Sequence, residues 1–187
     1  DETIDSIREC MAGDNRCRLL RHPRDLEDSK RRTDCGNRAV QRINDAIPLV
    51  RGEVVHYLAD DDWYALNRFE IFNELFANPE VVCGYGRLLC TEATGAKVIK
   101  GLYYKDVPGP YCHLDHNQTA HRSLVFRKHP RWNPDVGDWA SEGRWFQLLS
   151  RTWKFHGIDK VVAYKRFHSR CMQATQEYSD GIREADK

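Results

Sequence analysis

The sequence predicts an α/β fold with a mixed central sheet flanked by helices. Two observations lead to this prediction. Residues 33–58 have the pattern of an amphipathic helix, a glycine and a short apolar strand, which is the order of elements in a βαβ crossover. Two strands at 81–89 and 97–102 then follow each other with only a turn at 94–96 between them, so part of the sheet must be antiparallel.

Apolar side chains at helical spacing predict four helices. Thr3 can cap the first, in which Ile4, Ile7 and Met11 share one face before Gly13 ends it. The expected helices cover residues 3–11, 33–49, 67–77 and 139–153. The side chains expected to face the core are Ala39, Ile43, Ala46 and Ile47 in the second helix, Leu66, Phe69, Phe72 and Phe76 at the third, and Phe146, Leu149 and Trp153 in the fourth.

Short runs rich in β-branched and aromatic residues predict the strands. They cover residues 18–20, 54–58, 81–89, 97–102, 123–126 and 161–164. Gly84 and Gly86 lie inside one of these runs, where glycine indicates a bulge or a close backbone approach. The polar segment 175–187 is expected to be a frayed tail.

The composition indicates one folded domain. The chain has 187 residues, of which 41% are hydrophobic and 11% aromatic, enough for a sizeable core. Lys and Arg number 29 against 28 Asp and Glu, and this formal charge of +1 gives no argument for nucleic acid or an acidic membrane as partner. No apolar run approaches the ~20 residues of a transmembrane helix.

The cysteines indicate a cytoplasmic protein. There are seven, an odd number without a Cys-x-x-Cys pair, so reduced thiols are expected rather than a disulfide framework. The chain begins at Asp1 within a few residues of a helix, and we expect a domain over residues 1–187 whose N-terminal part is incomplete.

The stretch with the clearest chemical pattern is Asp60-Asp61-Asp62, directly behind the apolar run that begins at Val54. In an open α/β sheet, ligands bind at the carboxyl ends of strands. Adjacent carboxylates repel one another, and a hard divalent cation such as Mg²⁺, which takes carboxylate and phosphate oxygens, relieves that repulsion. The alternative is a solvated acidic turn that caps the next helix. The preceding strand favours a metal site.

Two further charged groups allow two interpretations each. The cations of Lys30-Arg31-Arg32 could bind a phosphate, or they could only solubilise the surface. Asp135, Asp138 and Glu142 gather near the start of the fourth helix, where carboxylates are expected as caps. One of them could instead be a general base, if the fold brings it opposite Asp60 and its neighbours.

Thiol and imidazole groups gather in the segment before the strand at 123–126. They are Cys112, His113, His116 and His121. Their spacing matches no standard tetrahedral zinc set, and no second cluster completes one. Loop histidines are therefore the preferred interpretation.

Four landmarks resemble the inverting family 2 nucleotide-diphospho-sugar glycosyltransferases, most closely the type that builds spore-coat polysaccharide. The similarity runs from residue 2 to about residue 168. The landmarks are Glu2–Arg8; Gly52-Glu53 with Tyr57–Tyr64 and Asn67–Phe69; Asp115-His116 with His121-Arg122; and Gly137-Asp138 with Arg144–Phe146. The resemblance implies a Rossmann-like nucleotide-diphospho-sugar transferase fold of the GT-A type.

The resemblance also implies a donor site. The acidic cluster corresponds to the DXD motif of the family, which binds Mn²⁺ or Mg²⁺ on the donor diphosphate. Asp60 resembles the ribose contact, and Asp61, together with Asp62, resembles the metal ligand. Arg32 resembles the basic contact to the nucleotide, with Arg31 as its alternative. His168, just past the last predicted strand, is a candidate for an additional metal or phosphate contact, and the alternative is a strand-end histidine without such a role.

The catalytic base implied by the resemblance is Asp138, which would deprotonate the acceptor hydroxyl as that oxygen attacks the anomeric carbon from the face opposite the leaving group. This chain departs from the family in two ways. It starts after the strands that bind the nucleotide base, and it has Ala59 where many relatives carry the first acid of the motif.

Three functions follow as hypotheses. The first is a metal-dependent glycosyltransferase that moves a sugar from a UDP- or dTDP-sugar to the hydroxyl of a carbohydrate or other acceptor. The second is a non-catalytic remnant of the same fold that binds a nucleotide or a glycan. The third is metal-assisted phosphoester hydrolysis by the acidic cluster with His113 and His116.

Overall fold

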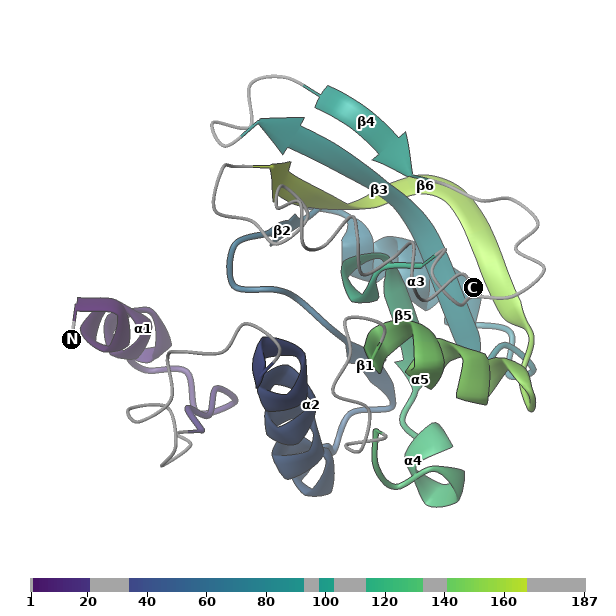
Figure 1. Ribbon diagram of the computed structural model, residues 1–187, viewed down its shortest axis with the longest axis horizontal. Coiled ribbons are helices and arrows are strands. Elements are labelled where there is room, and N and C mark those ends of the chain that lie inside the picture. The colour runs from purple at the N-terminus through teal and green to yellow at the C-terminus, as the bar shows by residue number, and fades with distance from the viewer. Residues whose placement is uncertain (1, 21–33, 93–97, 103–113, 133–140, 168–187) are drawn as a thin grey trace. The chain divides into compact units, whose positions relative to one another are not determined.

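The structure is a computed structural model that describes residues 2–20, 34–92, 98–102, 114–132 and 141–167 (Figure 1). The helices are α1 (Glu2–Met11), α2 (Asp34–Ala46), α3 (Arg68–Phe76), α4 (Val125–Lys128) and α5 (Ser141–Ser150), with the 3-10 turns η2 (Ile47–Leu49) and η3 (His116–Gln118). The strands are β1 (Val54–His56), β2 (Trp63–Tyr64), β3 (Cys83–Glu92), β4 (Val98–Leu102), β5 (Thr119–Arg122) and β6 (Phe155–Phe167). Arg32, Asp138, His168 and the predicted tail 175–187 lie outside the described residues. No described helix combines the length and the apolar character that crossing a membrane requires.

The chain divides into two compact units, residues 1–32 and 33–187. In the first unit, α1 forms where its helical spacing predicts it, and Gly13 follows with φ of 87°, the left-handed conformation that suits glycine behind a helix. The strand predicted at residues 18–20 was wrong. These residues pair with no described strand, and Leu20 is 50% exposed, so no ladder among the described residues holds them extended. One glycosyltransferase domain over residues 1–187 stays a prediction.

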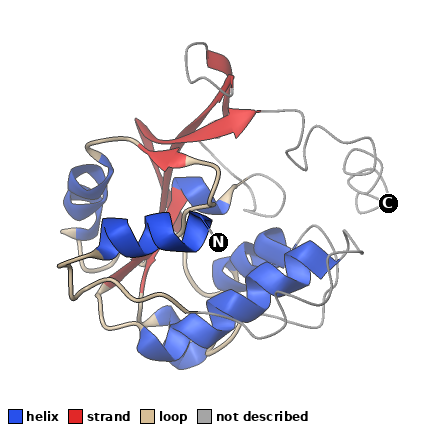
Figure 2. Cartoon of the chain, turned by 90° about the vertical axis from the view of Figure 1, so that its left-hand side faces the viewer, coloured by secondary structure: helices blue, strands red, loops and turns tan. Residues whose placement is uncertain are grey.

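The second unit is built on a mixed sheet with strand order β1-β5-β3-β6-β2, and β4 pairs with β3 beside this path. The two long strands, β3 and β6, run parallel, whereas the other pairs among the described strands are antiparallel. Figure 2 shows helices on both sides of the strands. The predicted class, α/β with a mixed central sheet flanked by helices, is confirmed.

Each face of the sheet has its own core. On one face, β3 packs against α2 and α5 through Cys83 and Tyr85, which lie beside Trp145, Phe146 and Leu149. On the other face, side chains of α3 pack against the sheet; they are Ile71, Phe72 and Phe76, against Val81, Ala120 and Val162. The alternation of side chains along β3 therefore separates the two layers.

The two glycines of β3 allow close approach, as the sequence predicted. A Cβ on Gly84 would lie 2.4 Å from Leu75 of α3, and one on Gly86 would lie 2.4 Å from Val162 of β6. The register between β3 and β6 also shifts after Tyr85, which is the irregularity that glycine indicated. Both positions bring neighbouring elements close to the centre of the sheet.

The predicted inner face of α3 was half wrong. Phe72 and Phe76 are buried, but Leu66 is fully exposed and Phe69 is 54% exposed. A charged residue, Arg68, takes the inner position and is 0% exposed. The apolar pattern could not show which side of α3 faces the sheet, because arginine is usually a surface residue.

Arg68 is buried because its guanidinium satisfies backbone carbonyls of three elements. It donates to Asn117 O at η3, to Thr119 O of β5 at 2.7 Å and to Val162 O of β6 at 3.3 Å. Its guanidinium carbon also lies 4.1 Å from the ring centroid of Tyr64. Burial lowers the pKa of Arg68 to about 10, so it stays charged at neutral pH. Arg68 thus connects α3 to the segment that carries the site.

Two smaller predictions need correction. Residues 123–126 were expected as a strand, but the strand β5 ends at Arg122 and α4 begins at Val125. Strand β5 is buried on both faces, yet three of its four residues, Thr119, His121 and Arg122, are polar. It therefore lacks the apolar run by which a buried strand is predicted from sequence. In α2, Ala39 is exposed, and the neighbouring Val40, 1% exposed, faces the core in its place.

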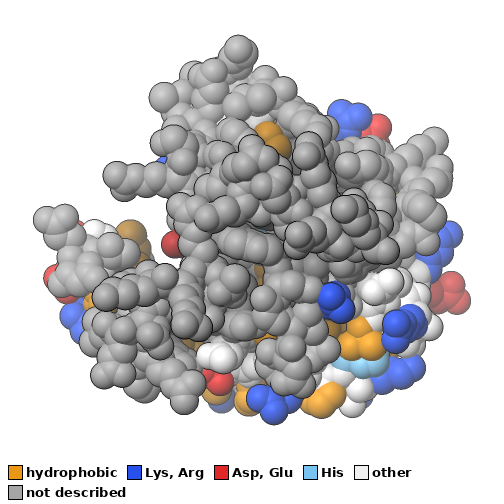
Figure 3. Space-filling model, in the orientation of Figure 1, with side chains coloured by type: hydrophobic (Ala, Val, Ile, Leu, Met, Phe, Trp, Pro, Cys, Tyr) orange, Lys and Arg blue, Asp and Glu red, His pale blue; other side chains and the backbone are white. Residues whose placement is uncertain are grey.

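Basic side chains gather over α4 and the end of α5, where Figure 3 shows them around apolar and histidine side chains. Arg127 and Lys128 end α4, and the ammonium of Lys128 lies 5.7 Å from the ring centroid of Trp153. Lys128 also donates to Thr152 at 3.0 Å. Surface cations of this kind keep a face solvated.

Candidate functional site

The acidic loop, residues 59–62, lies at the carboxyl end of the parallel pair of strands. The backbone N–H of Arg166, near the end of β6, donates to Asp62 Oδ1 at 2.7 Å. Asn117 Nδ2 donates to Asp62 Oδ2 at 2.7 Å, and the backbone N–H of Ala59 donates to Asn117 Oδ1 at 2.8 Å. These bonds place the acidic loop between β6 and η3, at the edge where an open α/β sheet binds ligands.

The three carboxylates of the acidic loop differ in environment. Asp60 is exposed, whereas Asp61 and Asp62 are half-buried. Burial raises the pKa of Asp62, and the charges of Asp61 and Asp115 raise it further, against the opposing effects of the Arg166 N–H and Lys165. The loop therefore concentrates negative charge that a cation would relieve.

The acidic loop fits a divalent cation in the chemistry of its donors. Carboxylate oxygens are the ligands that Mg²⁺ and Mn²⁺ prefer. Each oxygen of Asp62 accepts one hydrogen bond from a described residue, and a carboxylate oxygen can accept a second. Asp62 is thus anchored as well as able to coordinate, and Asp61 lies next to it.

The turn beside the acidic loop is rigid. Asp115 caps η3: its Oδ1 accepts from the Asn117 N–H at 2.8 Å, and its own N–H donates to Gln118 Oε1 at 3.2 Å. Gln118 Nε2 in turn donates to Gly86 O of β3 at 2.9 Å. Asn117 and Gln118 are 0% exposed. The sheet therefore holds in place the amide that fixes the acidic loop.

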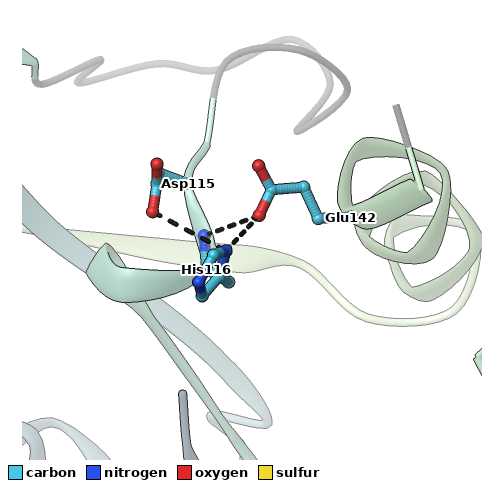
Figure 4. A group of neighbouring side chains, drawn as sticks. All are labelled: Asp115, His116 and Glu142. Carbon is cyan, nitrogen blue, oxygen red and sulfur yellow. Dashed lines mark hydrogen bonds and ion pairs between the residues drawn. The ribbon is translucent and has the colours of Figure 1, made fainter. Parts of the chain in front are cut away.

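A row of four charged side chains continues from this turn, and we call it the charged row: Lys165, Asp115, His116 and Glu142. Lys165 Nζ forms an ion pair with Asp115 Oδ2. His116 Nδ1 lies 3.9 Å from Asp115 Oδ1 and forms an ion pair with Glu142 Oε2 (Figure 4). The backbone N–H of His116 donates to the same Glu142 oxygen at 3.3 Å. The charged row joins β6, η3 and α5.

Positive and negative side chains alternate along the charged row, and each shifts the pKa values of its neighbours. Burial alone would lower the pKa of His116, but Glu142 and Asp115 outweigh burial and raise it to about 9. Burial also opposes the charge of Lys165, and Asp115 with Glu142 nevertheless raises its pKa. For Asp115, burial is outweighed by Lys165 and His116, which lower its pKa. At neutral pH the charged row consists of two ion pairs without net charge.

Asp115, His116 and Glu142 also offer one ligand atom each within 4.8 Å of one another, as a metal centre would require. The ion pairs weigh against a metal there, because the proton on His116 Nδ1 and the ammonium of Lys165 already neutralise the two carboxylates. A metal would have to displace that proton and compete with Lys165.

The zinc interpretation loses one of its four ligands. His121 is 1% exposed; its Nε2 lies 2.7 Å from the hydroxyl of Tyr57, and its Nδ1 lies 3.0 Å from the carbonyl of Arg122. Burial lowers the pKa of His121 to about 4. Both of its nitrogens are engaged in the core. Cys112 and His113 lie outside the described residues.

The structure thus brings Asp60, Asp61 and Asp62 together at one edge of the sheet. Sequence reasoning missed Asn117 and Arg166, which bond Asp62, and Lys165, which pairs with Asp115 beside the acidic loop. A signal for Lys165 existed, since it lies near the end of a predicted strand where ligand-binding side chains gather. Asn117 carries no comparable signal, because its bonds to residues 59 and 62 are long-range. The fold and the site define an α/β protein with an acidic loop and a neutral row of ion pairs at the carboxyl end of its parallel strands.

The chain matches no protein-family model, and its sequence gives no significant match to a curated protein. Among solved structures it is similar to S. aureus TarS 1–349, with 12% identity and a TM-score of 0.48 over 68% of this chain and 40% of that one. The same protein in complex with UDP has 12% identity and a TM-score of 0.49, over 72% of this chain and 41% of that one. Its complex with UDP-GlcNAc has 11% identity and a TM-score of 0.47, over 75% of this chain and 44% of that one. This chain spans less than half the length of these TarS chains. At such identities and TM-scores, the likeness decides neither the activity nor the ligands of this chain.

Proposed function

We propose that this chain belongs to a metal-dependent inverting glycosyltransferase of the GT-A type, which moves a sugar from a UDP- or dTDP-sugar to an acceptor hydroxyl. The observation that supports the proposal most is the anchoring of Asp62 by Asn117 and Arg166 at the carboxyl end of β3 and β6. Three carboxylates held at this edge suit a cation with a diphosphate, which an isolated acidic turn would not need.

The roles of the acidic loop follow from the resemblance of its residues. Asp61 and Asp62 would hold Mn²⁺ or Mg²⁺, with His168 as an additional ligand, and Asp60 would contact the ribose. Arg32 would bind the nucleotide. The bound cation would stabilise the negative charge that develops on the departing nucleoside diphosphate.

The proton moves to a residue of this chain. Asp138 would accept the proton of the acceptor hydroxyl while that oxygen forms its bond to the anomeric carbon. The bond from this carbon to the diphosphate oxygen breaks on the opposite face, so a single displacement inverts the stereochemistry. Water or an organic hydroxyl can serve as the attacking group, which makes donor hydrolysis a measurable side reaction.

The hydrolase hypothesis has less support. It needs His116 as a metal ligand or base, whereas the imidazole is protonated and paired with Glu142. A non-catalytic remnant that binds nucleotide without transferring sugar is the alternative that differs from the proposal only in turnover.

A thermal-shift titration of the 187-residue chain tests the donor site. We expect UDP or dTDP to raise the melting temperature in the presence of Mn²⁺, because a ligand that binds only the folded state must stabilise it. Asp61→Asn should abolish the rise. Glu74→Gln, which changes an exposed carboxylate on α3, should keep it. A rise that persists without metal and in Asp61→Asn would contradict the metal site, and no rise with either nucleotide would contradict the donor site.

A further inference from the structure

The charged row has a buried end and an accessible end. The side chains of Lys165 and Asp115 are 15% and 12% exposed, whereas those of His116 and Glu142 are 28% and 31% exposed. The second pair therefore meets solvent, and a ligand that binds the charged row must approach it there.

Within the part of the chain that the structure describes, each member of the accessible pair has one polar atom without a hydrogen-bond partner. Both bonds from His116 end on Glu142 Oε2, and Figure 4 shows the other carboxylate oxygen turned away from the imidazole. On the imidazole, Nδ1 makes the ion pair, and Nε2 makes no hydrogen bond to any described residue. Glu142 Oε1 likewise has no partner among the described residues. The pair thus presents one charged acceptor and one charged donor.

The chemistry of this pair selects a neutral hydroxylated ligand. An anion would be repelled by the Glu142 carboxylate, and a cation by the imidazolium and Lys165. A hydroxyl group can both donate to the carboxylate and accept from the imidazolium without disturbing either ion pair. A carbohydrate carries several such groups on one ring.

The accessible pair is adjacent to the acidic loop. Asn117, which bonds Asp62, follows His116 directly in η3. The carboxylates of Asp62 and Glu142 both raise the pKa of Lys165, so each lies near its ammonium group. In a nucleotide-sugar, the sugar is bonded to the terminal phosphate of the diphosphate. A diphosphate bound at the acidic loop therefore places its sugar directly beside that loop.

We propose that His116 and Glu142 form a carbohydrate-binding site, in which Glu142 accepts from one sugar hydroxyl and His116 Nε2 donates to another, and that the sugar is the one carried by the donor. This inference rests on the proposed function. It assigns the two residues a binding role that is separate from the metal ligands and from Asp138.

Isothermal titration calorimetry in Mn²⁺ tests the site, with UDP and the UDP-sugars UDP-glucose and UDP-N-acetylglucosamine as probes. The variants are Glu142→Gln, which removes the charged acceptor, and His116→Asn, whose amide can still meet Glu142 but does not reach as far as Nε2. We expect at least about tenfold weaker binding of one UDP-sugar in both variants, the scale of a lost charge-assisted hydrogen bond, and UDP affinity within about twofold of the wild type. Glu74→Gln is the control.

A second measurement distinguishes donor from acceptor. If the affinities for both UDP-sugars are unchanged while transfer to glucose as a hydroxyl probe falls relative to donor hydrolysis, the site binds the acceptor carbohydrate, and the assignment to the donor sugar is overturned. If neither affinity nor transfer changes in either folded variant, the carbohydrate site itself is overturned. Loss of one bound Mn²⁺ in Glu142→Gln would instead make the row a metal centre.

The outcomes also separate this inference from the proposed function. A wild type that binds UDP with Mn²⁺, together with variants that bind both UDP-sugars and transfer to glucose normally, overturns only the inference. A wild type that binds neither UDP nor UDP-sugar overturns both. Circular dichroism of each variant identifies one that has failed to fold, and the other variant then decides.

Discussion

Asn117 and Asp62 are separated by 55 positions in the sequence, yet Asn117 Nδ2 donates to Asp62 Oδ2 at 2.7 Å. The same amide accepts from the backbone N–H of Ala59 at 2.8 Å, so it holds the acidic loop at both ends. Because Asn117 is 0% exposed, water does not compete for these bonds. The shape of the acidic loop is therefore set by η3 rather than by the aspartates alone.

Asn117→Ala should loosen this loop. We expect the free energy of unfolding to fall by ~1–3 kcal/mol, since buried polar partners lose their bonds, and the Kd for UDP with Mn²⁺ to rise. Urea unfolding and calorimetry measure the two effects. Asn44→Ala is the matched control, because Asn44 makes a similar pair of bonds to the backbone of Trp132. Weaker UDP binding in both variants would point to general destabilisation.

Asp138→Asn should separate binding from turnover. If Asp138 is the base, the Kd for UDP stays as in the wild type while kcat falls by about 10²-fold or more, the usual scale of general base catalysis. Asp135→Asn, which changes a carboxylate three positions away, should keep its kcat. Donor consumption and product formation, followed by chromatography, provide the readout. An active Asp138→Asn enzyme would remove this residue from the mechanism.

Arg68→Met should destabilise the fold strongly. The methionine can fill the buried space, but the carbonyls of Asn117 and Thr119 lose their donor. We expect the free energy of unfolding to fall by about 3 kcal/mol or more, as unsatisfied buried acceptors are costly. Urea unfolding gives the value, and Arg127→Met on the exposed surface should change little. A neutral result would show that water replaces the guanidinium.

The main features of the fold could be predicted because they rest on local patterns. Phe146 and Leu149 face the core at the helical spacing that predicted them, and the acidic loop follows the apolar run at Val54. Arg68 could not be predicted, because its burial depends on carbonyls from three other elements. Leu66 was predicted buried since its spacing fits the stripe, and only the position of α3 on the sheet exposes it.

The candidate site was predictable in part. The three aspartates stand out in the sequence because adjacent carboxylates need an explanation. The charged row did not, since Lys165, His116 and Glu142 come from three distant segments and each has an ordinary surface role in isolation. Their alternation of charge exists only once β6, η3 and α5 meet.

Acid should destabilise the protein through the buried His121 and the half-buried His56. Burial lowers the pKa of His121 to about 4 and that of His56 to about 3, against about 6.5 in the unfolded chain. Between pH 6.5 and 4 the unfolded state therefore binds more protons than the folded state, and the free energy of unfolding falls as the pH falls. Urea midpoints across this range measure the slope. His121→Gln, if it folds, should reduce it.

His116 should act with the opposite sign on the alkaline side. Its pKa of about 9 in the folded state exceeds the value of about 6.5 in the unfolded chain. The ion pair with Glu142 is therefore fully present below pH 6.5, and its contribution is lost as the pH rises toward 9, because the folded state then holds a proton that the unfolded state has released.

Other groups, such as the buried thiol of Cys83, also titrate at high pH, so the informative quantity is the difference between variants. We expect His116→Asn and Glu142→Gln each to flatten the decline in unfolding free energy between pH 6.5 and 9, and Glu74→Gln to leave it unchanged. A decline of equal steepness in all four proteins would mean that His116 loses its proton near its ordinary pKa, and that the charged row does not hold it.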